Sequence, residues 1–147
     1  HRQPGLVGAV LTGAAQAGLI ADGIHVDPAA LRVALRARPT GLFLVTDCMA
    51  FAGSDMAEMQ LGGRRILRRD GRLTLEDGTL AGADLTLPQA VARVAALTGD
   101  PARALAMATA EPARVLGRGA ALTPGAPAEL TLYDPATGTA RLWLPAS

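Results

Sequence analysis

Apolar runs and an amphipathic stretch alternate along the first part of the chain. The segments 18–23 and 42–47 are short apolar runs that end in polar residues, a pattern typical of buried parallel strands. Between them, Asp27 and Pro28 form an N-cap signature, and apolar residues recur with helical spacing through 29–38. Strand, helix and strand with short connections predict a right-handed βαβ unit.

The middle of the chain has a different pattern, in which short strand candidates are separated by turn dipeptides. The candidates are 59–61, 64–69 and 72–75. The dipeptides Gly62-Gly63 and Asp70-Gly71 are typical of tight hairpin turns. We therefore expect an antiparallel β-hairpin excursion over about residues 57–76.

Helical signals return after residue 85, and the chain closes on two strand candidates. Thr86 and Asp100 are N-cap residues with a proline close behind, and Glu111-Pro112 begins a shorter segment. The predicted helices are 87–97, 101–107 and 111–117, and the predicted strands are 129–133 and 139–144.

Composition narrows the class of protein. Of the 147 residues, 50% are hydrophobic but only 3% are aromatic, which favours an α/β fold with an Ala, Leu and Val core. The net charge of +1 gives no reason to expect nucleic-acid or membrane binding. The most basic stretch, 64–69, lacks interleaved aromatic residues and is interpreted as a solvated face of a strand or hairpin.

Compartment and completeness are expectations from the same sequence. We find no signal peptide and no apolar run near the ~20 residues that a membrane helix needs. The single cysteine, Cys48, excludes an internal disulfide and fits a reducing cytoplasm. The chain does not begin with Met, and residues 1–5 read like the middle of a loop, so we expect a fragment of a longer protein.

Candidate chemistry follows the two predicted parallel strands, because α/β folds gather function at the carboxyl ends of such strands. Asp22 and His25 follow the first strand, and Asp47 ends the second. Each also has a structural interpretation: Asp22 and Asp47 as turn residues, and His25 as a hydrogen-bonding residue before a helix. Cys48 is interpreted as a small packed hydrophobe rather than a nucleophile.

Metal-ligand spacing is missing from the sequence, which has no His-x-His, His-Glu-x-x-His or Cys-x-x-Cys. The spacing therefore supports only an α/β domain with a candidate site at Asp47 and His25.

Six motifs carry a resemblance to a known family. They are RQPGLVG at 2–8, GLIADGIHV at 18–26, LVTD at 44–47, GTLAG at 78–82, MATAEPA at 107–113 and LTPG at 122–125. In order and spacing they resemble the N-acetylglucosamine-6-phosphate deacetylase family of the amidohydrolase superfamily. The Ile-Ala-Asp-Gly-x-His stretch is fairly specific, whereas the last motif is shared by many amidohydrolases.

The resemblance implies the C-terminal part of a (β/α)₈ TIM-type barrel with part of a small β-domain. Residues 1–117 would be barrel, and 118–147 would be strands of the small domain. It implies a cytoplasmic homodimer that removes acetate from N-acetylglucosamine 6-phosphate with a divalent metal ion, zinc or iron. The glutamate and two histidines that bind this metal in the family lie upstream, so no metal ligand is expected in this chain, and the isolated chain is expected to be inactive.

The resemblance also implies roles for individual residues. Asp47 would be the general base that later protonates the leaving amine. Arg2, across a dimer interface, and His25 would hold the sugar phosphate, and Leu80, Ala81 and Gly82 would also contact substrate.

Departures from the family pattern occur at four positions: Gln3 replaces a common glutamate, Cys48 and Phe51 replace small residues, and Ala83 replaces a serine. Cys48 and Phe51 are expected to narrow the mouth of the site. Two alternatives remain open: another amidohydrolase, related to dihydroorotases or hydantoinases, and a non-catalytic binding or scaffold module.

Overall fold

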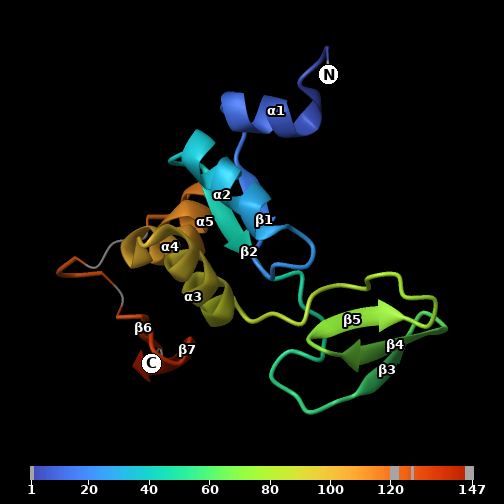
Figure 1. The fold of residues 1–147 in the computed structure, drawn as a ribbon. Coiled ribbons are helices and arrows are strands. Elements are labelled where there is room, and N and C mark those ends of the chain that lie inside the picture. Colours follow the sequence, from blue (N-terminus) through green and yellow to red (C-terminus); the bar gives the residue numbers. More distant parts are fainter. Residues whose placement is uncertain (1, 120–122, 127, 145–147) are drawn as a thin grey trace.

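The chain forms a mixed α/β structure, which a computed structural model describes for residues 2–119, 123–126 and 128–144 (Figure 1). The elements in chain order are α1 (Gly5–Thr12), β1 (Ala17–Ile20), α2 (Pro28–Ala37), β2 (Leu42–Val45), β3 (Glu58–Leu61), β4 (Arg64–Arg69), β5 (Arg72–Leu75), α3 (Leu87–Thr98), α4 (Pro101–Ala108), α5 (Ala110–Val115), β6 (Leu130–Asp134) and β7 (Thr139–Leu144).

The predicted parallel pairing is confirmed. β1 and β2 lie side by side in parallel, in a register that runs from Ala17 opposite Leu42 to Ile20 opposite Val45. The connecting helix α2 begins as the sequence predicts, because the Asp27 carboxylate accepts a hydrogen bond from the Ala29 N–H at 2.7 Å.

The main core covers only one face of these strands. Leu42 and Leu44 of β2 are buried against α3 and α4, whereas Phe43 and Val45 on the opposite face are only half-buried. The predicted burial of β2 is therefore confirmed for the face that carries Leu42 and Leu44, against which the helices pack.

The antiparallel excursion is confirmed as a three-stranded sheet in the order β3-β4-β5. Its turns use positive φ as the sequence indicates, with Gly62 at 56° and Gly63 at 75°. A second hydrophobic core, separate from the main one, consists of buried Phe51, Ile66 and Leu73.

Helix α1 was missed by the sequence analysis, which assigned no element before residue 18 and placed Gly5 in a loop. Residues 2–4 precede the helix, but Gly5 already belongs to it. Its sequence carries two glycines and no amphipathic pattern, its N-cap is Pro4 without a side-chain hydrogen bond, and none of its residues is buried. Periodicity therefore had no signal to detect.

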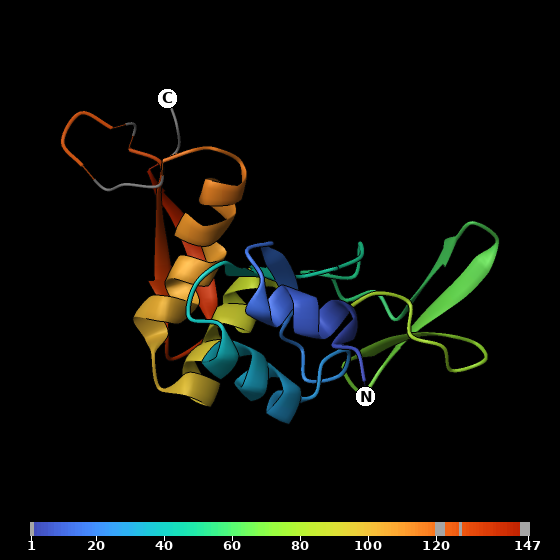
Figure 2. The same cartoon turned by 90° about the horizontal axis from the view of Figure 1, so that it is seen from above.

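The closing elements match the predicted ones within one or two residues. Helices α3, α4 and α5 occur as predicted, and β6 pairs with β7 in an antiparallel hairpin. Figures 1 and 2 show this hairpin and the β3–β5 sheet on opposite sides of the βαβ unit. Leu122 of the last motif lies outside the described residues.

Because the two hydrophobic cores are separate, we expect the β3–β5 sheet to unfold locally without opening the main core around β2 and α3. Phe51→Ala should cost about 3–5 kcal/mol, the usual loss for a buried phenylalanine, and should destabilise the β3–β5 sheet selectively. Native-state hydrogen exchange should show lost protection in β4 and β5 and unchanged protection in β2 and α3. Equal losses in both regions would contradict independent opening.

Candidate active site

The turn after β1 is organised by Asp22, whose side chain is 3% exposed. One carboxylate oxygen accepts hydrogen bonds from the N–H groups of Ile24 and His25, both at 2.9 Å. The other lies 2.6 Å from Nδ1 of His25. Because an ionised carboxylate only accepts, Nδ1 carries the hydrogen, and Nε2 of the imidazole is left for another partner. Asp22 therefore serves as a turn residue, and His25 is a hydrogen-bonding residue before α2, as their structural interpretations predict. The hydrogen bond to Asp22 also orients the imidazole.

Two opposing effects set the pKa of Asp22. Burial raises it, but the hydrogen bonds from the His25 side chain and from the two backbone N–H groups outweigh burial, so the pKa of Asp22 lies below its ordinary value. Arg93 of α3 fixes the same turn from outside, donating to the Asp22 carbonyl at 2.6 Å. Sequence analysis did not find this role of Arg93.

Asp47 follows β2 on the same edge of the sheet, as predicted. It is exposed and adopts φ 51°, a left-handed conformation that is uncommon for a residue with a side chain but tolerated by Asp and Asn. Its carbonyl accepts a hydrogen bond from the Ala83 N–H at 2.9 Å. The end of β2 is thereby joined to the segment that contains residues 80–82.

The close contact between these two segments requires glycine at position 82, because Gly82 has φ 88°. A Cβ atom there would lie 2.9 Å from Cγ of Met49 and 3.1 Å from the Asp47 carbonyl oxygen. The backbone of Gly82 therefore approaches the Asp47 loop more closely than any larger residue permits.

Asp47 lines a cavity of ≈ 650 Å³ with Leu80, Ala81 and Gly82. The complete lining is Asp47, Cys48, Met49, Leu61, Gly62, Arg64, Ile66, Leu75, Thr79, Leu80, Ala81 and Gly82. The structure thus brings together the residues that the family resemblance implies as general base and substrate contacts. Arg64, beside the β3–β4 turn, is a cavity residue that sequence analysis missed, because its arginine-rich strand gave no sign of facing a cavity.

Two expectations about this region are wrong. Cys48 is exposed at the cavity instead of packed. Phe51 does not narrow the site mouth, since it is fully buried in the second core. Ala83 is also buried, in the main core.

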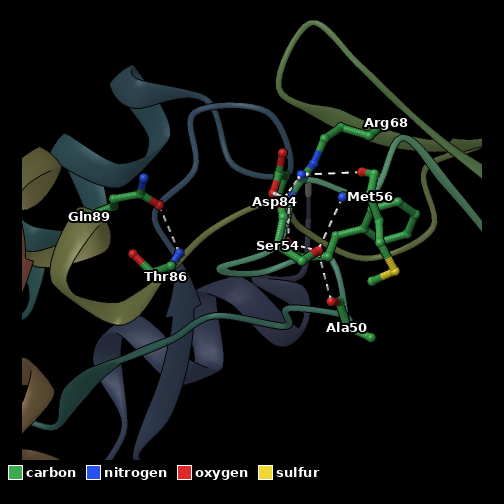
Figure 3. Close-up of polar contacts among 8 residues, drawn as sticks. Ala50, Ser54, Met56, Arg68, Asp84, Thr86 and Gln89 are labelled. Carbon is green, nitrogen blue, oxygen red and sulfur yellow. Dashed lines mark hydrogen bonds and ion pairs between the residues drawn. The ribbon is translucent and has the colours of Figure 1, made fainter.

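Arg68 corrects the interpretation of 64–69 as a solvated face. Its side chain is only 22% exposed, and Figure 3 shows it among the backbone carbonyls of the 50–56 loop and the carboxylate of Asp84. Arg64 and Arg65 on the same strand are exposed. Only part of the strand therefore faces solvent.

The predicted phosphate contacts, His25 and Arg2, are not among the described residues that line this cavity. His25 is absent from its lining, although its turn lies on the same edge of the sheet. Arg2 precedes α1, and Figure 1 shows α1 at the end of the sheet away from the loops that follow β1 and β2.

Within the described ranges, no three His, Cys, Asp or Glu residues lie together in a way that could hold a metal ion. These residues therefore do not fit a metal centre. Nor is any helix in these ranges both long and apolar enough to cross a membrane.

Curated relatives carry deacetylase names, although no protein-family model matches the chain. The chain is 37% identical to a putative N-acetylgalactosamine-6-phosphate deacetylase of Escherichia coli K12, over 98% of this chain and 89% of that protein. It is also 37% identical to the N-acetylgalactosamine-6-phosphate deacetylase of Escherichia coli O157:H7, of which it covers 40%. Against the N-acetylglucosamine-6-phosphate deacetylase of Bos taurus, identity is 37% and coverage of that protein is 36%.

The chain is also similar to solved structures of N-acetylglucosamine-6-phosphate deacetylases. The N-acetylglucosamine-6-phosphate deacetylase of Pasteurella multocida superposes with a TM-score of 0.80 and 32% identity, over 86% of this chain and 34% of that one. An aspartate-to-alanine mutant of the Mycobacterium smegmatis enzyme, in complex with N-acetyl-D-glucosamine 6-phosphate, gives a TM-score of 0.69 and 32% identity, over 76% of this chain and 31% of that one. The chain thus spans about a third of these solved chains.

The Asp22 turn predicts a pH-dependent contribution to stability. A carboxylate with a lowered pKa stabilises the fold above its unfolded pKa of about 3.9, and this stability is lost as pH falls through the lower folded pKa. Asp22→Asn should reduce the free energy of unfolding by about 1.5–3 kcal/mol at pH 7, the value of hydrogen bonds to a charged group.

Urea unfolding at pH 7 and at pH 3 would measure this difference, with exposed Asp55→Asn as the control. The gap between wild type and Asp22→Asn should shrink at pH 3. A gap of the same size at both pH values would mean that the charge of Asp22 contributes nothing.

Proposed function

The chain belongs to the N-acetylglucosamine/N-acetylgalactosamine-6-phosphate deacetylase family, and from this premise we propose that its complete protein hydrolyses N-acetylglucosamine 6-phosphate to glucosamine 6-phosphate and acetate. The names of the relatives favour this activity over a dihydroorotase or hydantoinase reaction and over a scaffold role. Because the chain spans only about a third of the solved enzymes, its own residues supply part of the active site.

One observation carries the proposal: Asp47 and the segment Leu80–Gly82 line a single cavity at the carboxyl edge of a parallel sheet. A carboxylate beside a substrate-sized cavity is the group that general-base hydrolysis of an amide requires. The left-handed φ of Asp47 supports a functional role, since such strain is concentrated at active sites.

The proposed reaction uses Asp47 twice. Its carboxylate takes a proton from the water that attacks the acetamide carbonyl, and a C–O bond forms. The same proton then passes from Asp47 to the amine nitrogen as the C–N bond breaks, which releases acetate and the amino sugar. Leu80, Ala81 and Gly82 bind the substrate beside this carboxylate.

Phosphate recognition is proposed for His25 and Arg2. Asp22 holds Nδ1 of His25, so Nε2 can donate to a phosphate oxygen when the imidazole is protonated. Arg2 precedes α1, which Figure 1 shows at the end of the sheet away from this turn, so we assign its phosphate contact to a partner subunit of a homodimer. A guanidinium suits a phosphate dianion through paired hydrogen bonds.

The remaining architecture is proposed on the same premise. Residues 1–117 form the late part of a (β/α)₈ barrel with the β3–β5 sheet as an excursion, and 118–147 contribute to a small β-domain. The half-buried face of Phe43 and Val45 would then line the barrel interior. A divalent ion, zinc or iron, would be bound by the glutamate and two histidines that the family carries upstream of the region this chain matches. A cytoplasmic location fits the single free cysteine.

The galactosamine epimer is a second candidate substrate, because the two Escherichia coli relatives bear that name. The two sugars differ only in the orientation of one ring hydroxyl. Acetate release by the complete protein from both 6-phosphates, compared as kcat/KM, decides between them, and no release from either would refute the deacetylase proposal.

Asp47→Asn should lower turnover by about 10²–10⁴ on the preferred substrate, the usual loss of a general base. Asparagine also tolerates the left-handed backbone, so the fold of the loop should survive. Steady-state turnover would be measured with metal content and with exposed Asp55→Asn as the control. A loss below about tenfold with metal retained would make Asp47 a turn residue only.

Arg2→Ala should weaken binding of the phosphorylated substrate by about 1.5–3 kcal/mol, because a charge-assisted hydrogen bond is lost. The loss should largely vanish with N-acetylglucosamine, which has no phosphate to bind. Arg32→Ala, which removes an exposed arginine of α2, is the control. Equal losses on both sugars would show that Arg2 has a structural role.

A further inference from the structure

The cavity beside Asp47 is lined by residues of the β3–β5 sheet and by two stretches outside it. One is the loop 46–56 after β2, which carries Asp47, and the other is the segment 79–84, which carries Leu80–Gly82. On one side this second segment is tied to β5, where Ala81 N–H donates to the Leu73 carbonyl at 3.0 Å. On the other it is tied to Asp47 through Ala83. The separation between general base and substrate contacts therefore depends on how these stretches are held together.

Arg68 of β4 contacts both stretches with one guanidinium group (Figure 3). On the loop side it donates to the carbonyls of Phe51 at 2.5 Å and Ser54 at 2.6 Å, with a longer contact to Met56 at 3.3 Å. On the segment side it donates to the Asp84 carboxylate at 2.7 Å. Asp84 follows Gly82 by two residues, so the contact ends close to the proposed substrate-binding backbone.

The guanidinium also lies over an aromatic ring. Its carbon lies 5.3 Å from the centroid of the Phe51 ring, and Phe51 is fully buried in the second core. Nε of Arg68 is buried without a hydrogen-bond partner among the described residues. The group is therefore held from several sides, and a shorter side chain could not reach the loop carbonyls and Asp84 together.

We propose that Arg68 is a positioning residue for the deacetylase site, one that fixes the Asp47 loop relative to Leu80–Gly82 by bridging Phe51, Ser54 and Asp84. This role rests on the proposed function, because it matters to catalysis only if Asp47 and Leu80–Gly82 act on one substrate. Loss of the bridge lets the two stretches shift, and a misplacement of about 1 Å can cost on the order of 100-fold in rate. Arg68 itself touches no reacting atom.

The test compares Arg68→Gln, Arg68→Lys and Asp84→Asn in the complete protein, with Arg69→Gln as the matched control. Arg69 is the neighbouring, exposed arginine of β4. In Arg68→Gln, kcat should fall about 10- to 100-fold while KM changes little, since the phosphate contacts lie elsewhere. Lysine should not restore kcat, because a single ammonium cannot span carbonyls and carboxylate at once. The double variant of Arg68 and Asp84 should lose less than the sum of the single losses.

Cys48 supplies a readout that needs no activity. Its thiol is exposed beside Asp47, so its alkylation rate, followed on the peptide that contains it, reports on the geometry of that loop. The rate should change several-fold in Arg68→Gln and stay at the wild-type value in Arg69→Gln. If the wild-type protein releases no acetate while this rate still responds, the deacetylase proposal and the catalytic role of Arg68 fall together, although the bridge itself is real.

A purely structural role gives a different result. Melting temperature would then fall in Arg68→Gln while kcat, measured well below that temperature, stayed at the wild-type value. That outcome would overturn the positioning role. So would a Cys48 alkylation rate in Arg68→Gln that equals the wild-type rate, provided that the wild-type protein releases acetate.

Discussion

Parallel pairing of β1 with β2 is the constraint on which the candidate site depends. Because the two strands run in the same direction with Ile20 opposite Val45, the turns that follow them emerge at one edge of the sheet. Asp22 and His25 occupy one turn, and Asp47 begins the other. Burial of Leu42 and Leu44 against α3 and α4 fixes this edge, since a shift of one residue would expose the leucines.

Arginines hold the loops that the sheet leaves unpaired. Arg93 donates to the Asp22 carbonyl, Arg68 to carbonyls of the 50–56 loop, and Arg103 to the carbonyls of Leu35 and Arg38. Backbone carbonyls outside regular structure need donors, and one guanidinium supplies several in fixed geometry. Of the four arginines on β4, only Arg68 holds a loop in this way, whereas Arg64, Arg65 and Arg69 are exposed.

Local sequence predicts the elements of this fold better than it predicts their surroundings. The Asp27 cap, the Gly62-Gly63 turn and the βαβ pairing follow from short-range chemistry and appear as expected. Helix α1 has no amphipathic pattern and was missed, and the exposure of Cys48 depends on which elements cover the end of β2. The family motifs implied that Asp47 and Gly82 serve one site, but the hydrogen bond at Ala83 that joins their segments was not predicted, because it links positions far apart in the chain. Tertiary contacts of this kind leave no periodic signal.

The central claim is that one cavity presents the Asp47 carboxylate to an acetamide while the sugar phosphate binds elsewhere on the same edge of the sheet. A crystal structure of the complete protein with N-acetylglucosamine 6-phosphate, bound to an Asp47→Asn variant to prevent turnover, would test it most directly. The acetamide should lie beside residue 47 and the backbone of Leu80–Gly82, with the phosphate near Nε2 of His25. A sugar bound with its phosphate beside residue 47, or outside this cavity, would contradict the account.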